Sequence, residues 1–404
     1  MRDHAIPQKS VETTDRGFEA LGLSVPVLES LRRVGFEHPT PVQAGVIPLA
    51  LAGRDVIGLA ETGTGKTAAF VLPILENLRQ GHGPRCLILC PTREIALQTL
   101  SFFEAVGRPL GLLSVCLIGG VKIQPQIQRL RKGVDAVVAT PGRLLDHAER
   151  GTLVLAEIEE LVLDEADHML DLGFLPQILA ILERLPAARR TMMFSATMPP
   201  AVDRLAQRLL RQPIYVDLRP AGGVAEGISH RLYLVEEENK KPCLLALARG
   251  EPGSMLIFLR RKVDAEWACR QLELEGHPVE RIHSDRSQGQ RVAALEGFRE
   301  GEHRILVATD IAARGLDIPR IQHIVNFDPP ATVEDYIHRA GRTARGAAKG
   351  TVSTIATWMD RPMIREIEGA LGQELPRCTA PGVEPYLEPK TTVRGRKRIR
   401  RRLL

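Results

Sequence analysis

The sequence contains no uninterrupted apolar stretch close to the ~18–20 residues that a membrane-spanning helix requires. Residues 1–7 include no apolar segment of the kind found in secretory signals. Six cysteines are present without a CxxC pair, and Cys86 and Cys90 lie in an apolar segment. Core thiols are therefore expected in place of zinc ligands or disulfides. Together these absences predict a cytoplasmic protein that does not span a membrane.

The 404 residues are 44% hydrophobic and 25% charged, the composition of an ordinary globular protein with two or three domains. The net charge of +5 is unevenly spread. Residues 373–404 contain nine Lys or Arg and three Glu, a net +6, so the rest of the chain is nearly neutral at −1. This composition predicts a basic, disordered tail that binds polyanions. A solvated tail that only improves solubility is the alternative.

Short apolar segments alternate with helix-like segments along the chain, a pattern that predicts α/β domains with mostly parallel sheets. Glycine and proline at 218–229 predict a linker. We therefore expect an N-terminal extension at 1–17, a first domain at 18–217, a second domain at 230–372 and the tail at 373–404. The predicted strands lie near 55–59, 86–90, 114–118, 135–138, 160–163, 191–194, 230–235, 254–259, 279–282, 304–308, 321–325 and 351–355.

A glycine-rich turn between an apolar strand and an alanine-rich segment ends in Gly65, Lys66 and Thr67. Glycines let backbone N–H groups face a phosphate, and the following helix N-terminus adds partial positive charge. We expect Lys66 to reach the β- and γ-phosphates and the Thr67 hydroxyl to bind Mg²⁺. A flexible loop that happens to contain a lysine is the alternative, since Ala60 stands where the usual pattern has glycine. The predicted nucleotide-binding residues of the loop are Thr62, Gly63, Thr64, Gly65, Lys66 and Thr67.

A second cluster, Asp164-Glu165-Ala166-Asp167, directly follows a short apolar strand. Carboxylates at the C-terminal edge of a parallel strand lie where open α/β sheets bind ligands. We expect Asp164 to hold Mg²⁺, partly through water, and Glu165 to orient and deprotonate the attacking water. The alternative is an acidic helix start, since Asp and Glu favour first turns.

The second half of the chain has no such cluster, but it carries Arg339, Arg342 and Arg345 at spacing i, i+3, i+6. On a helical turn this spacing puts the three side chains roughly on one face. Arginines that reach a γ-phosphate from a facing surface stabilise charge during phosphoryl transfer. We expect at least one of the three to act as a catalytic finger, and a general phosphate or nucleic-acid patch is the alternative.

With these motifs in order, residues 18–360 resemble the DEAD-box ATP-dependent RNA helicases. The resemblance implies two tandem RecA-like domains, each a mostly parallel sheet flanked by helices, with ATP and Mg²⁺ as cofactors. Residues 35–43 are similar to the family's adenine motif, which implies that Gln43 hydrogen-bonds the adenine edge. It also implies that Phe18 stacks on the ring, although Phe18 could equally be a core anchor. The resemblance implies that Arg342 and Arg345 are the catalytic fingers, and that Gly315 and Asp317 lie near the nucleotide.

The resemblance also implies RNA contacts that carry no sequence information. Surface ion pairs are the alternative for Arg93 and Arg143. The implied RNA-binding residues are Pro91, Thr92, Arg93, Gly119, Gly120, Thr140, Pro141, Gly142, Arg143, Gln288, Arg291 and Thr309. The residues implied to couple hydrolysis to domain closure are Asp167, Ser195, Thr197 and Arg339, where the hydroxyl residues could instead be turn formers.

The activity implied is ATP-dependent RNA unwinding that is local and non-processive, or remodelling of RNA–protein complexes. An ATP-gated RNA clamp is a second candidate. A directional DNA translocase is a third, but it is not expected to carry the motif at 35–43. The implied partner is RNA, single-stranded and duplex, together with ribosome-assembly or RNA-degradation factors, and the protein is expected to be a monomer.

Overall fold

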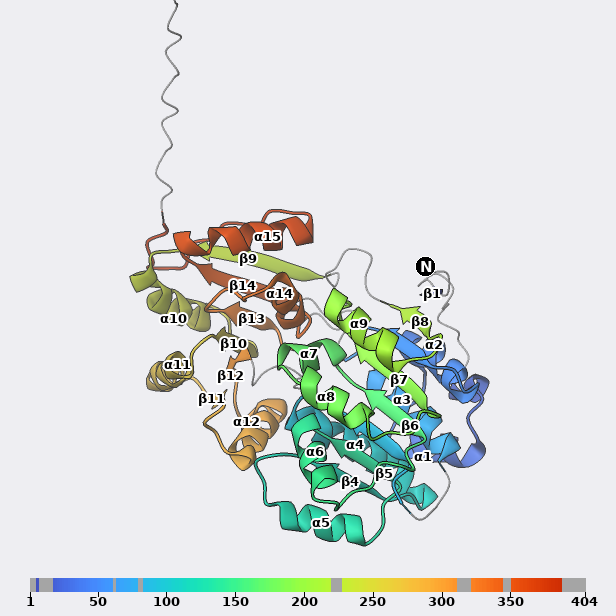
Figure 1. Cartoon of the computed structure of the whole chain (residues 1–404). Coiled ribbons are helices and arrows are strands. Elements are labelled where there is room, and N and C mark those ends of the chain that lie inside the picture. The colour runs from blue at the N-terminus through green and yellow to red at the C-terminus, as the bar shows by residue number, and fades with distance from the viewer. Residues whose placement is uncertain are drawn as a thin grey trace, which may run out of the picture.

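Two parallel β-sheets, each covered by helices on both faces, form the described part of the chain (Figure 1). The computed structural model describes residues 5–6, 17–60, 63–78, 83–218, 227–310, 321–343 and 350–386. Every strand pair in both sheets is parallel. The carboxyl ends of the strands therefore share one edge of each sheet, which is where a ligand site is expected.

The first sheet has eight strands in the order β1-β8-β2-β7-β6-β3-β5-β4. Short runs of Val, Ile and Leu form them, because strands buried on both faces need apolar side chains on both sides. Their bounds are β1 (Ala5–Ile6), β2 (Val56–Leu59), β3 (Cys86–Leu89), β4 (Ser114–Leu117), β5 (Ala136–Ala139), β6 (Glu160–Leu163), β7 (Arg190–Ser195) and β8 (Ile214–Asp217).

Alternate residues of these strands pack into two separate core layers. In β3, Cys86 and Ile88 join one layer, whereas Leu87 and Leu89 join the other. The first layer includes 3-10 turn η2 (Phe18–Leu21), α1 (Val25–Arg33), α2 (Pro41–Leu51), α3 (Lys66–Asn77) and α4 (Arg93–Gly107). The second includes α6 (Pro141–Glu149), α7 (Ala166–Asp171), α8 (Leu175–Leu182) and α9 (Pro200–Leu209). Turn η3 (Arg108–Leu110) follows α4, and α5 (Ile123–Arg131) contacts edge strand β4.

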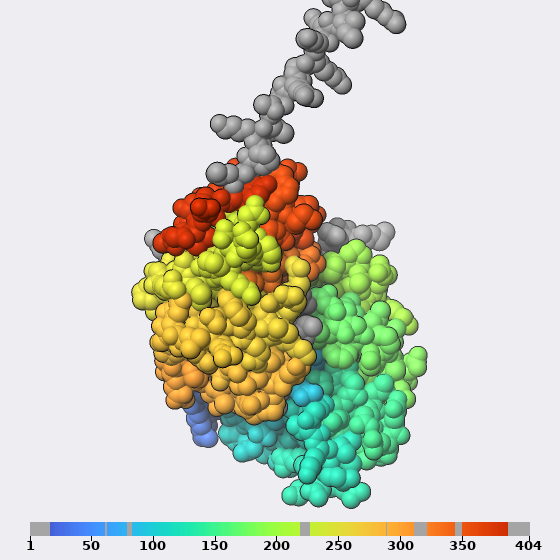
Figure 2. Space-filling model, turned by 90° about the vertical axis from the view of Figure 1, so that its left-hand side faces the viewer, coloured from blue at the N-terminus to red at the C-terminus, as the bar shows by residue number. Residues whose placement is uncertain are grey.

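The second sheet has six strands in the order β11-β12-β10-β13-β14-β9. The strands are β9 (Ile228–Leu234), β10 (Met255–Leu259), β11 (Val279–Ile282), β12 (Ile305–Thr309), β13 (His323–Asn326) and β14 (Gly350–Ala356). One core layer includes α12 (Gln288–Glu300), α14 (Val333–Ala340) and α15 (Arg361–Leu371), and the other α10 (Lys240–Gly250) and α11 (Lys262–Leu274). Turns η4 (Glu237–Asn239) and η5 (Trp358–Asp360) precede α10 and α15. Figure 2 shows the second lobe, yellow to red, seated against the green and cyan surface of the first.

The sequence predicted the parallel α/β fold and a strand at each of twelve positions, and the structure confirms both. It missed β8, which pairs with β2, and the two-residue β1 at the sheet edge. The cysteines are free, as expected, and Cys86 and Cys90 are fully buried. None of the described helices is long and apolar enough to cross a membrane.

The disordered tail was expected to begin at residue 373, but residues 373–386 are ordered. Residues 373–386 pack against the second domain, where Leu375 is only 1% exposed. The carbonyl of Pro376 accepts a hydrogen bond from the Leu232 amide, and the Tyr386 amide donates to Leu234. This segment thereby covers the open edge of β9, which explains why it is ordered. Residues 387–404, which include the basic run, lie outside the described residues.

Candidate active site

The phosphate loop lies between β2 and the buried helix α3, as predicted. Gly63 and Gly65 have φ angles of 84° and 94°, a region that glycine adopts without strain. Lys66 and Thr67 are the first residues of α3, so both stand at a helix N-terminus. The Lys66 ammonium donates to the carbonyl of Ala60 at 3.1 Å, across the loop. The loop therefore has the geometry of an anion cradle, while Thr62 lies outside the described residues.

Gln43 is buried, and both ends of its amide make hydrogen bonds within the protein. Its Oε1 accepts from the Thr40 backbone at 2.8 Å, which closes the capping box of α2. Its Nε2 donates to the Gly65 carbonyl at 3.1 Å. A Cβ at Gly65 would collide with this amide, so glycine is required there. Gln43 therefore connects the predicted adenine motif to the phosphate loop.

Phe18 is 3% exposed and packs edge to face on Phe36, with ring centroids 6.4 Å apart. Both rings border a cavity of about 370 Å³ that Glu19, Arg32 and Gly35 also line. The burial of Phe18 fits a core anchor, and its place at the cavity fits a wall for a bound base. Adenine stacking by Phe18 stays a prediction.

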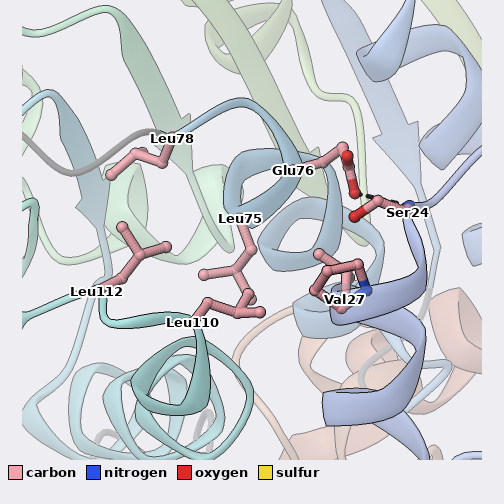
Figure 3. A pocket seen from close by; sticks show the side chains of 8 residues that line it. Ser24, Val27, Leu75, Glu76, Leu78, Leu110 and Leu112 are labelled. Carbon is pink, nitrogen blue, oxygen red and sulfur yellow. Dashed lines mark hydrogen bonds between the residues drawn. The ribbon is translucent and has the colours of Figure 1, made fainter.

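A second cavity, of about 380 Å³, lies between α1, α3 and η3 (Figure 3). Six of its eight lining residues have apolar side chains, and at one side the Ser24 amide donates to the Glu76 carboxylate at 2.9 Å. None of the predicted site residues lines this cavity, so it contributes nothing to the predicted chemistry. Its lining residues are Ser24, Pro26, Val27, Leu75, Glu76, Leu78, Leu110 and Leu112.

Asp164 follows β6 at the ligand edge of the sheet and is buried. Burial raises the pKa of its carboxyl, an effect that the charge of Lys66 reduces. Its Oδ1 is buried and has no hydrogen-bond partner among the described residues. A buried carboxylate oxygen left in this way fits a hard cation that keeps its waters, such as Mg²⁺. Asp164, together with the predicted Thr67 hydroxyl, would hold Mg²⁺.

Glu165 has a left-handed backbone with φ 52° and ψ 57°, which is uncommon for a residue with a side chain. Such strain persists where the surrounding structure enforces it, often at functional sites. Burial acts to raise the pKa of Glu165, but the hydrogen bond from His168 and the charges of Lys66, His168 and Arg342 together lower it. Glu165 is therefore held as a carboxylate, the form that can accept a proton.

Asp167 is joined to the turn that follows β7. Its Oδ2 accepts hydrogen bonds from the Thr197 backbone at 2.8 Å, the Thr197 hydroxyl at 2.9 Å and the Ala196 backbone at 3.1 Å. The Ser195 hydroxyl in turn accepts from the Asp167 backbone at 3.3 Å. The hydroxyl residues are thus bonded to the carboxylate cluster, and their role in coupling stays a prediction.

Arg339 and Arg342 do not belong to one continuous helix, contrary to expectation. Helix α14 ends at Ala340, and Arg342 lies in the following turn. Arg339 is buried inside the second domain, where it forms a two-pronged ion pair with Asp310 and donates to Asn326. Arg342 is also buried, and its charge reaches Glu165 of the first domain. Arg345 lies outside the described residues.

Three predicted RNA-binding segments of the first domain follow β3, β4 and β5 and therefore meet at one sheet edge. Thr92 caps α4, and the Arg93 guanidinium lies so close to Gly120 that a Cβ there would overlap it. Arg143 donates to the Val121 carbonyl at 3.1 Å and lies 3.7 Å from Asp146, so it does take part in an ion pair. Beside them lie Pro91 and Gly119, together with Thr140, Pro141 and Gly142, which begin α6.

In the second domain, Gln288 begins α12 and Thr309 ends β12. Arg291 forms an ion pair with Glu94 of the first domain, with Nη2 3.1 Å from Oε1. Gly315 and Asp317 lie outside the described residues. RNA contact by this set stays a prediction.

Sequence reasoning missed three partners of the predicted residues. They are Glu94, which pairs with Arg291; His168, which bonds Glu165; and His338, whose Nε2 lies 4.0 Å from Asp167. Only His168 gave a signal, since it follows Glu165 by three residues in a helical segment. The other two pairs join the two domains and have no signature in a single sequence.

Comparison with known proteins identifies the family. Residues 40–205 match the DEAD/DEAH box helicase family, and residues 239–347 match the helicase conserved C-terminal domain. The DEAD-box ATP-dependent RNA helicase CshA of Geobacillus kaustophilus is 40% identical over 373 residues, covering 92% of this chain and 80% of that protein.

Two solved structures share the fold. Saccharomyces cerevisiae Dbp5 bound to RNA and ADP BeF3 is 30% identical, with a TM-score of 0.81 over 90% of this chain and 96% of that chain. A Dbp5 variant bound to Gle1 and IP6 is 31% identical, with a TM-score of 0.73 over 90% of this chain and 95% of that chain. The two sheets are thus tandem RecA-like domains, and the chain belongs to the DEAD-box ATP-dependent RNA helicases.

Proposed function

We propose that this helicase couples ATP binding and hydrolysis to local, non-processive unwinding of RNA duplexes or to remodelling of RNA–protein complexes. The observation that carries the proposal is the set of electrostatic contacts between the two domains, of which Arg291 with Glu94 is an ion pair. Arg342 acts on Glu165, His338 lies beside Asp167, and Arg291 pairs with Glu94. Predicted catalytic groups and predicted RNA-binding groups thus meet across the same interface between the two domains. Closure of the interface would therefore complete the catalytic site and the RNA-binding surface together.

The proposed chemistry is hydrolysis of the γ-phosphate. The phosphate loop with Lys66 binds the phosphates, and Glu165 accepts a proton from a water whose oxygen bonds to the γ-phosphorus. The bond between that phosphorus and the bridging oxygen breaks, and ADP and phosphate leave. Arg342 stabilises the negative charge that develops on the phosphoryl oxygens. Asp164 and Thr67 would hold Mg²⁺, which when bound would neutralise phosphate charge.

The two Dbp5 structures support a closed arrangement for this chain. The likeness is greater to Dbp5 with RNA and ADP BeF3, at 0.81, than to the variant with Gle1 and IP6, at 0.73. The coverage is nearly equal, and we attribute the difference to how the parts are arranged. We infer that nucleotide and RNA favour this closed state together, and therefore that each raises the affinity of the other. Opening after phosphate release then frees the RNA, which keeps unwinding local.

The test combines ATP turnover with strand separation. ATP hydrolysis is measured with no nucleic acid, single-stranded RNA, duplex RNA and duplex DNA, and the release of a labelled strand is followed in the RNA duplex. We expect RNA to stimulate turnover strongly, duplex DNA to have little effect, and short RNA duplexes to separate better than long ones. RNA-stimulated turnover without strand release would favour the ATP-gated clamp, and stimulation by duplex DNA would favour a translocase.

RNA is the proposed partner through backbone and 2′-hydroxyl contacts. Its physiological identity, ribosome-assembly or RNA-degradation partners, a monomeric state and a cytoplasmic location stay predictions. The domain bounds of 18–217 and 230–372 are proposed with one change, in that the second domain extends to residue 386.

A further inference from the structure

His168 is a buried histidine that the chemistry above does not use. It lies on α7, and its Nδ1 is 3.1 Å from Oε2 of Glu165. The two side chains are 5% and 11% exposed, so little water competes for this hydrogen bond. Nδ1 must donate, because a carboxylate only accepts. The contact therefore assigns the ring proton to Nδ1.

The rest of the imidazole has no competing polar contact. Nε2 is buried and has no hydrogen-bond partner among the described residues. With the proton on Nδ1, Nε2 presents a lone pair, which avoids burying a donor without an acceptor. Among the described residues, the ring of His168 thus makes one hydrogen bond, from Nδ1 to Glu165.

The backbone of His168 is fixed as well. Its N–H donates to Oδ1 of Asp167 at 3.0 Å, and the other oxygen of Asp167 holds the Ala196–Thr197 turn. His168 therefore lies between the proposed base and the carboxylate that contacts the coupling turn. Glu165 needs such support, because its left-handed backbone does not by itself fix the side-chain torsions and the nearby Lys66 attracts its carboxylate.

We propose that His168 is a positioning residue for ATP hydrolysis, which aims the Glu165 carboxylate at the attacking water through the Nδ1 hydrogen bond. This inference rests on the proposed role of Glu165 as the base. A misplacement of a reacting group by about 1 Å can cost about 10²-fold in rate, so loss of the bond should act on turnover. It should not act on ATP binding, because the hydrogen bonds that His168 donates within the described part of the chain go to Asp167 and Glu165 and not to the phosphate loop.

The test replaces His168 with asparagine or glutamine, whose side-chain amide nitrogens take different positions relative to the two ring nitrogens. In His168→Asn the amide nitrogen takes a position close to Nδ1, whereas in His168→Gln it lies close to Nε2. RNA-stimulated kcat and KM for ATP are measured in the full chain for both variants, for His168→Ala and for Glu165→Gln. We expect kcat to fall about 10- to 100-fold in His168→Ala and His168→Gln, with KM within about twofold of the original. His168→Asn should keep most of the turnover.

The outcomes separate this inference from the proposed function. Normal turnover in Glu165→Gln would show that Glu165 is not the base, and the whole assignment would fail. Impaired Glu165→Gln with normal His168→Ala would overturn the positioning role alone. Equal turnover in the Asn and Gln variants would also overturn it, because both are polar amides and a merely structural role would not distinguish the position of the nitrogen.

Discussion

Glu94 and Arg291 form an ion pair between the two domains, with Oε1 and Nη2 3.1 Å apart. Their side chains are 8% and 15% exposed, so salt screens this pair less than a surface pair. Glu94 follows Arg93 on α4, and Arg291 lies on α12. The pair thus links two surfaces that the sequence predicted to contact RNA.

Glu94→Gln or Arg291→Gln should weaken domain closure. Loss of one partner of a partly buried pair is expected to cost about 1–2 kcal/mol, a factor of roughly 5–30 in an equilibrium constant. The measurement is the RNA concentration that gives half-maximal ATP turnover, which should rise by that factor. Exchange of the charges, Glu94→Arg with Arg291→Glu, should restore much of the loss. The single variant Arg291→Glu is the comparison. If the double variant needs as much RNA for half-maximal turnover as Arg291→Glu does, Arg291 acts on RNA and not through Glu94.

Gly58 in β2 faces Phe194 in β7, and a Cβ there would lie 2.6 Å from the ring. Gly58→Ala should therefore destabilise the first domain by about 1–3 kcal/mol, as overpacking does in a dense core. Gly369→Ala in α15 is the matched control, since a Cβ there meets nothing within 4 Å. The control should be neutral or stabilise by up to about 1 kcal/mol. Denaturant unfolding measures both, and equal stability of the two variants contradicts this view of the core.

We expect His323 to make the stability of the second domain depend on pH. Burial lowers its pKa from 6.5 to about 4, and Nε2 lies 2.8 Å from the Ser353 hydroxyl. Between those two pKa values the unfolded chain binds a proton that the folded chain does not, so stability falls as pH falls from about 6.5 towards 4.

For His323 this effect amounts to about 2 kcal/mol between about pH 7.5 and pH 5. His323→Gln keeps a polar atom near Nε2 but does not titrate. The free energy of unfolding should therefore fall less with pH in His323→Gln than in the unaltered protein. An identical fall in both proteins would assign the pH dependence to other groups.

Deletion of residues 390–404 should weaken RNA binding and leave the saturated ATPase rate nearly unchanged. Eight of these residues are basic, so their loss should also flatten the salt dependence by about 0.7 log units per phosphate contact. Deletion from residue 373 is the contrast, because it removes buried Leu375 and the hydrogen bonds to β9. That longer deletion should lower the unfolding temperature of the second domain. Unchanged RNA affinity and salt slope in the shorter deletion would identify the tail as a solubility or docking element.

The sequence predicted those features that depend on local pattern. Buried parallel strands appear as apolar runs. Asp164 and Glu165 directly follow such a strand, and Lys66 begins the helix after another, so their neighbourhood follows from the topology. Prediction from the sequence failed for features whose structure depends on tertiary contacts. Strand β8 is short and only partly buried, and the order of residues 373–386 depends on the open edge of β9.

The arginine cluster shows the same limit. A spacing of i, i+3, i+6 describes a helix, but α14 ends at Ala340, before Arg342. The spacing alone also could not show that Arg339 forms an ion pair with Asp310, which lies 29 residues earlier. Pairs such as Glu94 with Arg291 join separate domains, and only the folded arrangement reveals them.

RNA-stimulated ATP turnover of Arg342→Ala tests the central claim that the second domain completes the catalytic site. The account predicts a fall of about 10³-fold or more, as for the loss of an arginine finger, with ATP affinity in the absence of RNA unchanged. Arg365→Ala, which removes an exposed arginine of the same domain, should keep normal turnover. Normal RNA-stimulated turnover in Arg342→Ala would contradict the account.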